Sequence, residues 1–225
     1  MASTAQATSS SHYNILHNLS ADELARVDAI SKPLQFKPND YICRSGAESP
    51  YVYRIDSGCA MTERLSSNGK RHVMAFLFPG SFVGFFDWLS FDLSVKSLQQ
   101  TQVTVFPRGA FFRLCEEIPQ LKDNMDRIAK AILASALDYM YILSQKNADE
   151  RLCFFLQQLA LREKGSIEGE VIVPCSREDI ADHLGLSKET ISRAMTRLRV
   201  KRIIRQSKAN TLQILDPIAL AEVAR

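Results

Sequence analysis

The chain has 225 residues, of which 46% are hydrophobic and 24% charged, with a formal net charge of +3. This composition is ordinary for a water-soluble protein, and the length favours two domains over one. So weak a net charge does not identify a partner, although seven Lys and Arg residues fall between positions 193 and 208.

The first dozen residues, "MASTAQATSSSH", lack the basic and apolar regions of a signal peptide, and we predict that residues 1–12 are disordered. No later segment approaches the roughly 18 consecutive apolar residues that a membrane span needs. We therefore expect a cytoplasmic protein with no membrane partner.

The first folded part is expected over residues 13–117. "LSADELARVDAI" predicts a helix that begins at Ser20, with Glu23 three residues later to complete a capping box. Between Ser31 and Pro107, short apolar runs alternate with glycines, and an Asn-Gly pair at 68–69 is typical of a hairpin turn. Short, evenly spaced strands of this kind predict an antiparallel β-roll.

A long helix is expected over residues 118–147, which contain no glycine. One apolar stripe follows a heptad spacing, and we assign it to a dimer interface: Leu121, Met125, Ile128, Ile132, Ser135, Tyr139 and Ile142. A second stripe runs beside it: Ala129, Leu133, Ala136, Met140 and Leu143. A helix with two apolar stripes has two surfaces to pack against. The alternative is a core helix within a monomer.

Residues 148–225 follow the order helix, strand, two helices and β-hairpin, which is that of a winged helix-turn-helix. Ser176 is expected to cap the first of the two short helices, Gly185 to end it, and Ser187 to cap the second. The fold class is therefore α+β: an N-terminal antiparallel β-roll, a long dimerisation helix and a C-terminal winged helix-turn-helix.

The second short helix, residues 187–199, is expected to lie in a DNA major groove. Arg193 matches guanine O6 and N7, Glu189 can accept from the cytosine amino group, and Ser192 can serve either role, so these residues and Lys188 are candidate base readers. Glu189 and Arg193 also have the spacing of a helical ion pair, and both interpretations can hold together. Contacts to phosphates are expected from six residues: Ser176, Ser187, Thr190, Arg197, Lys201 and Lys208.

The five cysteines are scattered without the spacing of a metal site, and no metal is predicted. Cys175 differs from the others because it precedes the Ser176 cap, where a helix N-terminus favours the thiolate. Oxidation of this thiol would place negative charge beside the predicted helix-turn-helix. A buried, inert cysteine is the alternative.

This order of domains resembles that of the Crp/Fnr superfamily of bacterial transcription regulators. "GSFVGF" (80–85), "LSQKNADERL" (143–152) and "DIADHLGLSKETISRAMTRL" (179–198) resemble the FNR and FixK branch. In that branch an E-x-x-S-R recognition helix reads TTGAT half-sites in an inverted repeat, which implies that Glu189, Ser192 and Arg193 are the readers. The resemblance also implies a homodimer that activates transcription through RNA polymerase.

Two departures from the superfamily bear on cofactors. Members that bind cyclic nucleotides have a Glu and an Arg-Ser pair where this chain has Phe85 and, approximately, Phe91 and Asp92, so we do not expect cyclic AMP to bind. Members with an iron–sulfur cluster carry N-terminal cysteines and a later one. Here no cysteine precedes Cys43, and Thr104 takes the later place, so no FNR-type cluster is expected.

Two other functions compete with this one. A metal-dependent enzyme on a cupin-like roll would need several histidines, but His72 is the only histidine in the expected roll, so an enzyme is not predicted. A regulatory module that responds to an unidentified small molecule in the roll is the other alternative. "GFFDWLSFDL" (84–93) could line such a site or fill the core.

Overall fold

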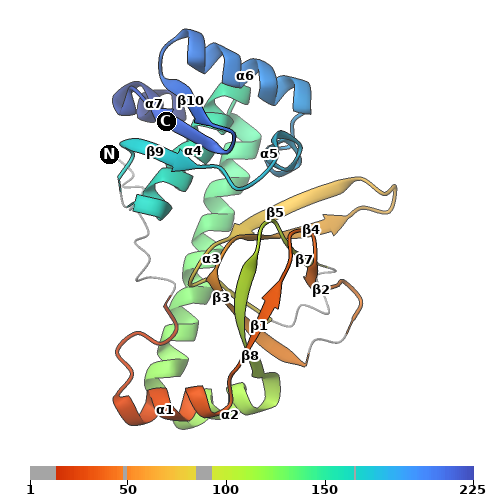
Figure 1. The fold of residues 1–225 in the computed structure, drawn as a ribbon, viewed down its shortest axis with the longest axis vertical. Coiled ribbons are helices and arrows are strands. Elements are labelled where there is room, and N and C mark those ends of the chain that lie inside the picture. Colours follow the sequence, from red (N-terminus) through yellow and green to blue (C-terminus); the bar gives the residue numbers. More distant parts are fainter. Residues whose placement is uncertain (1–13, 48–49, 85–92, 165) are drawn as a thin grey trace. The chain divides into compact units, whose positions relative to one another are not determined.

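The computed structural model describes residues 14–47, 50–84, 93–164 and 166–225, without the side chains of 163 and 164. It divides inside one long helix, between Leu133 and Ala134, into an N-terminal and a C-terminal unit. None of the described helices is long and apolar enough to cross a bilayer. The mixture of an antiparallel roll, a long helix and a helix-turn-helix confirms the predicted α+β class (Figure 1).

The described strands of the N-terminal unit form two four-stranded antiparallel sheets, with strand orders β1-β8-β3-β6 and β2-β7-β4-β5. The strands are β1 (Lys32–Phe36), β2 (Tyr41–Cys43), β3 (Tyr51–Ser57), β4 (Ala60–Leu65), β5 (Arg71–Leu77), β6 (Phe82–Val83), β7 (Ser94–Ser97) and β8 (Thr101–Pro107). In the β4–β5 hairpin Gly69 has a φ of +79°. A left-handed glycine after a type I turn is typical of a three-residue hairpin loop, so the predicted turn is present with Gly69 as its left-handed residue.

Alternation along the strands divides the buried side chains of this unit into two cores. One lies between the sheets and includes Tyr53, Val83 and Val105. The neighbouring residues Val52 and Phe106 point to the opposite face, because successive side chains of a strand alternate. That face packs against α1 (Ala21–Ala29), α2 (Arg108–Glu117) and the first turns of α3 (Pro119–Gln145).

Local signals account for two helix boundaries in this unit. The predicted capping box of α1 is formed, since the Ser20 hydroxyl accepts from the Glu23 backbone N–H and the Glu23 carboxylate accepts from the Ser20 N–H. The long helix expected over 118–147 begins at Pro119, directly after α2. Proline lacks a backbone N–H and is favoured in the first turn of a helix, so it separates α2 from α3.

The described part of the C-terminal unit contains the last turns of α3 and seven further elements. These are α4 (Ala148–Lys164), β9 (Gly169–Ile172), α5 (Arg177–Leu184), α6 (Lys188–Val200), β10 (Ile204–Lys208), β11 (Thr211–Ile214) and α7 (Pro217–Ala224). The strands form a three-stranded antiparallel sheet in the order β10-β11-β9. The last helix was not predicted from the sequence, although Asp216 caps it and proline occupies its first position.

Candidate DNA-binding surface

The geometry of α5 and α6 is that of a helix-turn-helix with a cap at each start. Ser176 and Asp179 form a reciprocal capping box, in which the Asp179 N–H donates to Ser176 Oγ at 3.1 Å. Gly185 ends α5 in the left-handed region with a φ of +63°. Ser187 then caps α6 by accepting from the Thr190 N–H at 3.1 Å. A three-residue turn therefore sets the angle between the two helices.

One face of α6 is used for packing within the unit. Its buried residues are Ile191, Ala194, Met195 and Leu198. They recur at helical spacing and pack α6 onto the rest of the unit. The opposite face, which includes Glu189, Arg193 and Thr196, is exposed.

The four candidate base readers lie on or beside this exposed face. Lys188, Glu189 and Arg193 are exposed, and Ser192 is half-buried. The Glu189 carboxylate accepts hydrogen bonds from its own backbone N–H and from the Ser187 hydroxyl, which lower its pKa, with smaller contributions from the charges of Lys188 and Arg193. The possible ion pair between Glu189 and Arg193 is thus a minor influence on this carboxylate.

Arg177 is a neighbour of Ser192 that was not among the site residues predicted from the sequence. This first residue of α5 is exposed, and its Nη1 donates to Ser192 Oγ at 3.4 Å. A residue fifteen positions earlier in the chain therefore contributes a cation to the same surface. Its place at the start of a capped helix was the available signal.

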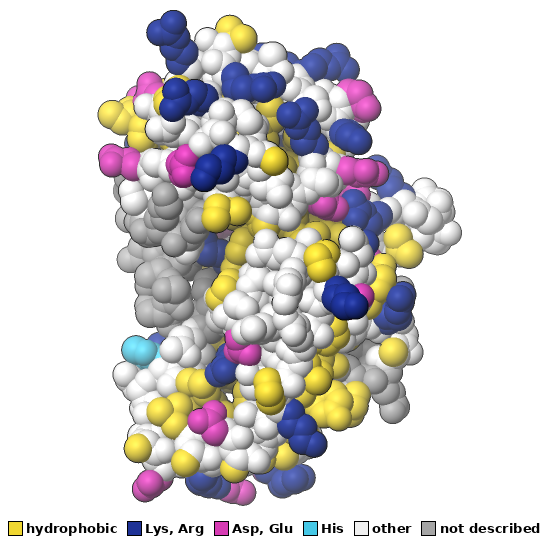
Figure 2. Space-filling model, in the orientation of Figure 1, with side chains coloured by type: hydrophobic (Ala, Val, Ile, Leu, Met, Phe, Trp, Pro, Cys, Tyr) yellow, Lys and Arg dark blue, Asp and Glu magenta, His cyan; other side chains and the backbone are white. Residues whose placement is uncertain are grey.

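The hydroxyl groups among the candidate phosphate contacts already have partners in their caps. Ser176 Oγ accepts from the Asp179 N–H and donates to Asp179 Oδ2 at 2.7 Å. Ser187 Oγ lies 3.0 Å from Thr190 Oγ1. Lys201 and Lys208, by contrast, are exposed residues with charged side chains. Figure 2 shows many Lys and Arg side chains on the surface of the C-terminal unit, at the top of the view.

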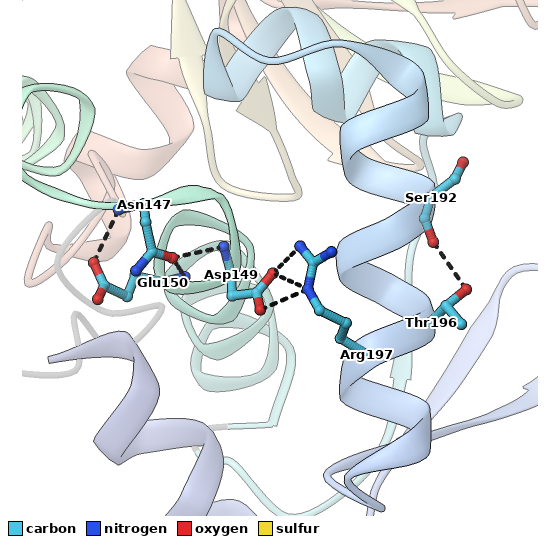
Figure 3. Close-up of polar contacts among 6 residues, drawn as sticks. All are labelled: Asn147, Asp149, Glu150, Ser192, Thr196 and Arg197. Atoms are coloured by element: carbon cyan, nitrogen blue, oxygen red, sulfur yellow. Dashed lines mark hydrogen bonds and ion pairs between the residues drawn. The ribbon is translucent and has the colours of Figure 1, made fainter.

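Arg197, the remaining candidate phosphate contact, is held by a carboxylate on another helix (Figure 3). Its Nε lies 2.9 Å from Asp149 Oδ2, and its Nη2 lies 2.5 Å from Asp149 Oδ1. These bonds raise the pKa of the guanidinium. Asp149 is itself fixed at the start of α4, where its N–H donates to Asn147 Oδ1 at 3.0 Å. Arg197 thus points toward α4, whereas Ser192 and Thr196 lie on the other side of α6.

The predicted dimer stripe on α3 is not one exposed face, because several of its residues are buried or partly buried within the single chain. Leu121 and Ile128 are buried in the helical core of the N-terminal unit, and Met125 packs against it. Ile142 is also buried, and Tyr139 donates a hydrogen bond to the His183 carbonyl. Side chains that the chain itself covers cannot be covered by a partner.

The exposed apolar face of α3 includes members of the second stripe. Leu133, Leu137, Met140 and Tyr141 have exposed fractions of 61%, 58%, 67% and 57%. The first three are spaced by four and three residues, so they lie on one side of the helix. From the first stripe, Ile132 and Ser135 are also exposed. The sequence indicated two packing surfaces, and the structure shows which of them is open.

Cys175 is half-buried, whereas Cys59, Cys115 and Cys153 are buried. Burial raises the pKa of Cys115 to about 11 and that of Cys153 to about 12, and it raises that of half-buried Cys43 to about 11. These three thiols are therefore protonated at neutral pH. Within the described ranges, no group of three or more His, Cys, Asp or Glu side chains could hold a metal ion.

The described parts of the roll enclose an apolar core with a few buried polar residues. The core between its sheets is largely aliphatic. The buried polar and charged residues described in this unit include no cation that could meet a phosphate: Thr62, Glu63, Ser81, Ser97, Thr101 and Asn124. Phe85, Phe91 and Asp92, on which the sequence argument rests, lie outside the described residues, as does most of "GFFDWLSFDL".

Comparison with known proteins gives matches in both parts of the chain. Residues 33–118 match the cyclic nucleotide-binding domain family, and residues 150–223 match the Crp-like helix-turn-helix domain family. The transcriptional activator protein Anr of Pseudomonas protegens is 31% identical over 92% of this chain and 86% of its own length. The nitrogen fixation regulation protein FixK of Bradyrhizobium diazoefficiens is 30% identical over 82% of this chain and 78% of its own.

A solved structure agrees with these matches. That of FixK2 from Bradyrhizobium japonicum superimposes with a TM-score of 0.80 at 26% identity, and the match covers 87% of this chain and 98% of that one.

Proposed function

Because this chain belongs to the Crp/Fnr family of bacterial transcription regulators, we propose that it is a homodimeric activator that reads an inverted repeat of TTGAT-like half-sites. The family consists of regulators rather than enzymes, and its C-terminal domain is a DNA-binding helix-turn-helix. The relatives whose names call them activators support activation of transcription. In this proposal the protein acts in the cytoplasm, through contacts with RNA polymerase. Control by a small molecule in the roll is the alternative.

The observation that carries the proposal is the exposed face of α6. Glu189 and Arg193 are exposed on a capped helix whose opposite face is buried, and Ser192 lies beside them. The guanidinium offers two parallel donors to guanine, and the carboxylate accepts from cytosine. Lys188, at the first position of α6, adds a fourth group that can reach a base edge.

The phosphate contacts in this proposal are Ser176, Ser187, Thr190, Arg197, Lys201 and Lys208. Lys201 and Lys208 need no rearrangement because they are exposed. Arg197 would exchange the Asp149 carboxylate for a phosphate, since both offer oxygen acceptors to the same guanidinium. Such contacts add affinity for any sequence.

A dimer is proposed because α3 exposes an apolar face that a second copy can cover. Leu133, Leu137 and Met140 are each more than half exposed, and soluble proteins rarely leave such a row uncovered. A twofold axis along this face would relate two recognition helices. These would enter successive major grooves about 34 Å apart, which explains an inverted repeat.

We do not include cyclic AMP or an iron–sulfur cluster in the proposal. The aliphatic core between the sheets supports this for the cyclic nucleotide. For the cluster the support comes from Thr104, whose Oγ1 donates to Asp56 Oδ2 at 2.6 Å and accepts from Arg54 Nη2 at 3.2 Å. A side chain in such a polar cluster does not offer a metal ligand of the cysteine type.

Modulation by oxidation at Cys175 is a further part of the proposal. The half-exposed thiol lies next to the Ser176 cap and two residues from Arg177 on the candidate DNA surface. Added negative charge there would repel phosphates. Titration of DNA affinity with peroxide should weaken binding by the native protein but not by Cys175→Ala. Equal sensitivity of the two proteins would remove this part of the proposal.

The main test is a mobility-shift titration on a TTGAT inverted repeat. Arg193→Ala should weaken binding by about 10-fold to 100-fold per half-site and should relax the preference at one guanine. Arg113→Ala, the same change at an exposed position on α2, is the matched control and should bind as the native protein does. If Arg193→Ala kept both affinity and base preference, the assignment of readers would be wrong.

A further inference from the structure

Three helices of the C-terminal unit meet at the end of α5, immediately before the turn of the helix-turn-helix. The last carbonyls of a helix have no partner within it and need donors from elsewhere. Here the carbonyls of His183 and Leu184 receive donors from other helices: the Tyr139 hydroxyl of α3 and the Arg151 guanidinium of α4. The C-terminal end of α5, the first helix of the helix-turn-helix, is therefore held by side chains of α3 and α4.

Arg151 joins the C-terminal ends of two helices. Its Nη1 donates to the Leu184 carbonyl at 3.0 Å, and its Nη2 donates to the Leu143 carbonyl of α3 at 2.8 Å. Its Nε donates to the Lys146 carbonyl, just beyond α3, at 2.8 Å. Helix C-termini carry partial negative charge, so a cation between two of them is favourable. The planar fork of arginine reaches three carbonyls that one ammonium group could not.

Tyr139 supplies the second connection. Its ring stacks on that of His183, with centroids 4.7 Å apart and planes inclined by 21°. Phe155 of α4 makes an edge contact with the His183 ring, with centroids 5.8 Å apart. Burial raises the pKa of the Tyr139 hydroxyl, which keeps its proton available for the His183 carbonyl.

The turn itself lies close to these parts. A Cβ atom built on Gly185 would lie 3.8 Å from Arg151 Nη1 and 4.0 Å from Leu143 Cδ2. The turn that sets the angle of α6 thus lies beside the arginine and α3. Since α6 follows Gly185 after two residues, its direction depends on where the end of α5 is held.

We propose that Tyr139 and Arg151 are positioning residues for DNA recognition. They fix the helix-turn-helix (α5 and α6) to the end of α3 and so set the spacing of half-sites that the dimer accepts. This inference rests on the proposed function, because it needs a dimer joined through α3 and an inverted repeat. The two residues touch no base in this arrangement. They determine where the base readers are, not which bases these prefer.

Spacing is sensitive to such a connection. Each base pair added between half-sites moves them apart by about 3.4 Å and rotates one against the other by about a tenth of a turn. A helix-turn-helix held by the hydrogen bonds of Tyr139 and Arg151 to the end of α5 cannot follow this change without breaking one of them. A helix-turn-helix that has lost one of these hydrogen bonds can follow it. Removing either bond should therefore reduce the loss of DNA affinity that a wrong spacing causes.

The experiment measures affinity for TTGAT inverted repeats whose spacer is one base pair shorter, unchanged, or one base pair longer. Tyr139→Phe removes one oxygen and keeps the stacked ring, and Arg151→Gln removes the fork and the charge. In both variants we expect the ratio of affinities between best and altered spacing to fall by about threefold to tenfold. Arg151→Lys, which keeps the charge, should restore part of the ratio.

Two controls separate positioning from stability and from base reading. Lys146→Gln removes a charge at the same helix end without altering the carbonyl that Arg151 contacts, and should keep the native ratio. Base substitutions within one half-site should have the same effect on native protein and variants. Circular dichroism verifies folding, and Tyr139→Phe carries the test if Arg151→Gln does not fold.

The outcomes distinguish this inference from the proposed function. Variants that lose affinity by the same factor at every spacing, or that lose none, would overturn the positioning role and leave the proposed function standing. A native protein that binds no inverted repeat would overturn both.

Discussion

Leu137→Ala tests the proposed dimer face on α3. The side chain leaves 58% of its surface exposed in the single chain. Burying a whole leucine contributes about 1.5 to 3 kcal/mol, so covering this part contributes about 1 to 2 kcal/mol per protomer. A twofold interface contains the residue twice, which gives about 2 to 3.5 kcal/mol per dimer.

These free energies convert into a measurable change in dimer dissociation. Because about 1.4 kcal/mol corresponds to a tenfold change, Leu137→Ala should raise the dissociation constant by about 20-fold to 300-fold. Sedimentation equilibrium over a range of protein concentrations measures this constant directly. Alanine is the best helix former, so the substitution should not weaken α3 itself.

Ile128→Ala is the matched control on the same helix. Ile128 is 1% exposed and lies in the core of the N-terminal unit, so its truncation should lower the free energy of unfolding by about 2 to 5 kcal/mol. It should leave the dissociation constant of the folded dimer unchanged. A native dissociation constant for Leu137→Ala, together with a raised one for Ile128→Ala, would refute the reasoning and restore the first stripe as the interface.

Further predictions concern the DNA surface and the buried thiols. Arg197→Ala should weaken binding to all sequences alike and reduce the slope of log affinity against log salt by about 1, whereas Asp149→Asn, which frees Arg197, should strengthen binding to all of them. Ser176→Ala should lower the free energy of unfolding in urea by about 1 kcal/mol through loss of the α5 cap. The unfolded chain ionises its thiols near pH 8.5, whereas the folded-state pKa of Cys115 is raised to about 11 and that of Cys153 to about 12. The unfolded state therefore loses these protons first, and stability that is complete below about pH 8.5 should fall as pH rises through 11 to 12 in urea titrations.

Local sequence signals identified those parts of the protein that depend on neighbours in the chain. The caps at Ser20, Ser176 and Ser187 and the left-handed Gly185 are present as predicted, because each needs contacts within a few residues. The order of roll, long helix and helix-turn-helix followed from the same kind of evidence. The final helix, which was not predicted, had a comparable signal, with Asp216 before a proline.

Long-range partners could not be read from the sequence. The stripe of Leu121 and Ile128 and the stripe of Leu133 and Met140 have equivalent periodicity, and only the three-dimensional packing distinguishes the buried one. The partner of Arg197 lies 48 residues earlier in the chain. Charge and exposure pattern alone therefore suggested a free phosphate contact, because nothing local marks Asp149 as its partner.

The junction at the end of α5 also limits how the DNA-binding part can be exchanged between proteins. A segment cut at the start of α4 contains Arg151 but loses the Leu143 carbonyl and the Tyr139 hydroxyl, because both belong to α3. A segment that begins at Ala134 retains all of these groups in one piece. Chimaeras with related regulators should therefore be joined within α3, ahead of Tyr139. The helix-turn-helix then keeps its contacts with Tyr139 and Arg151.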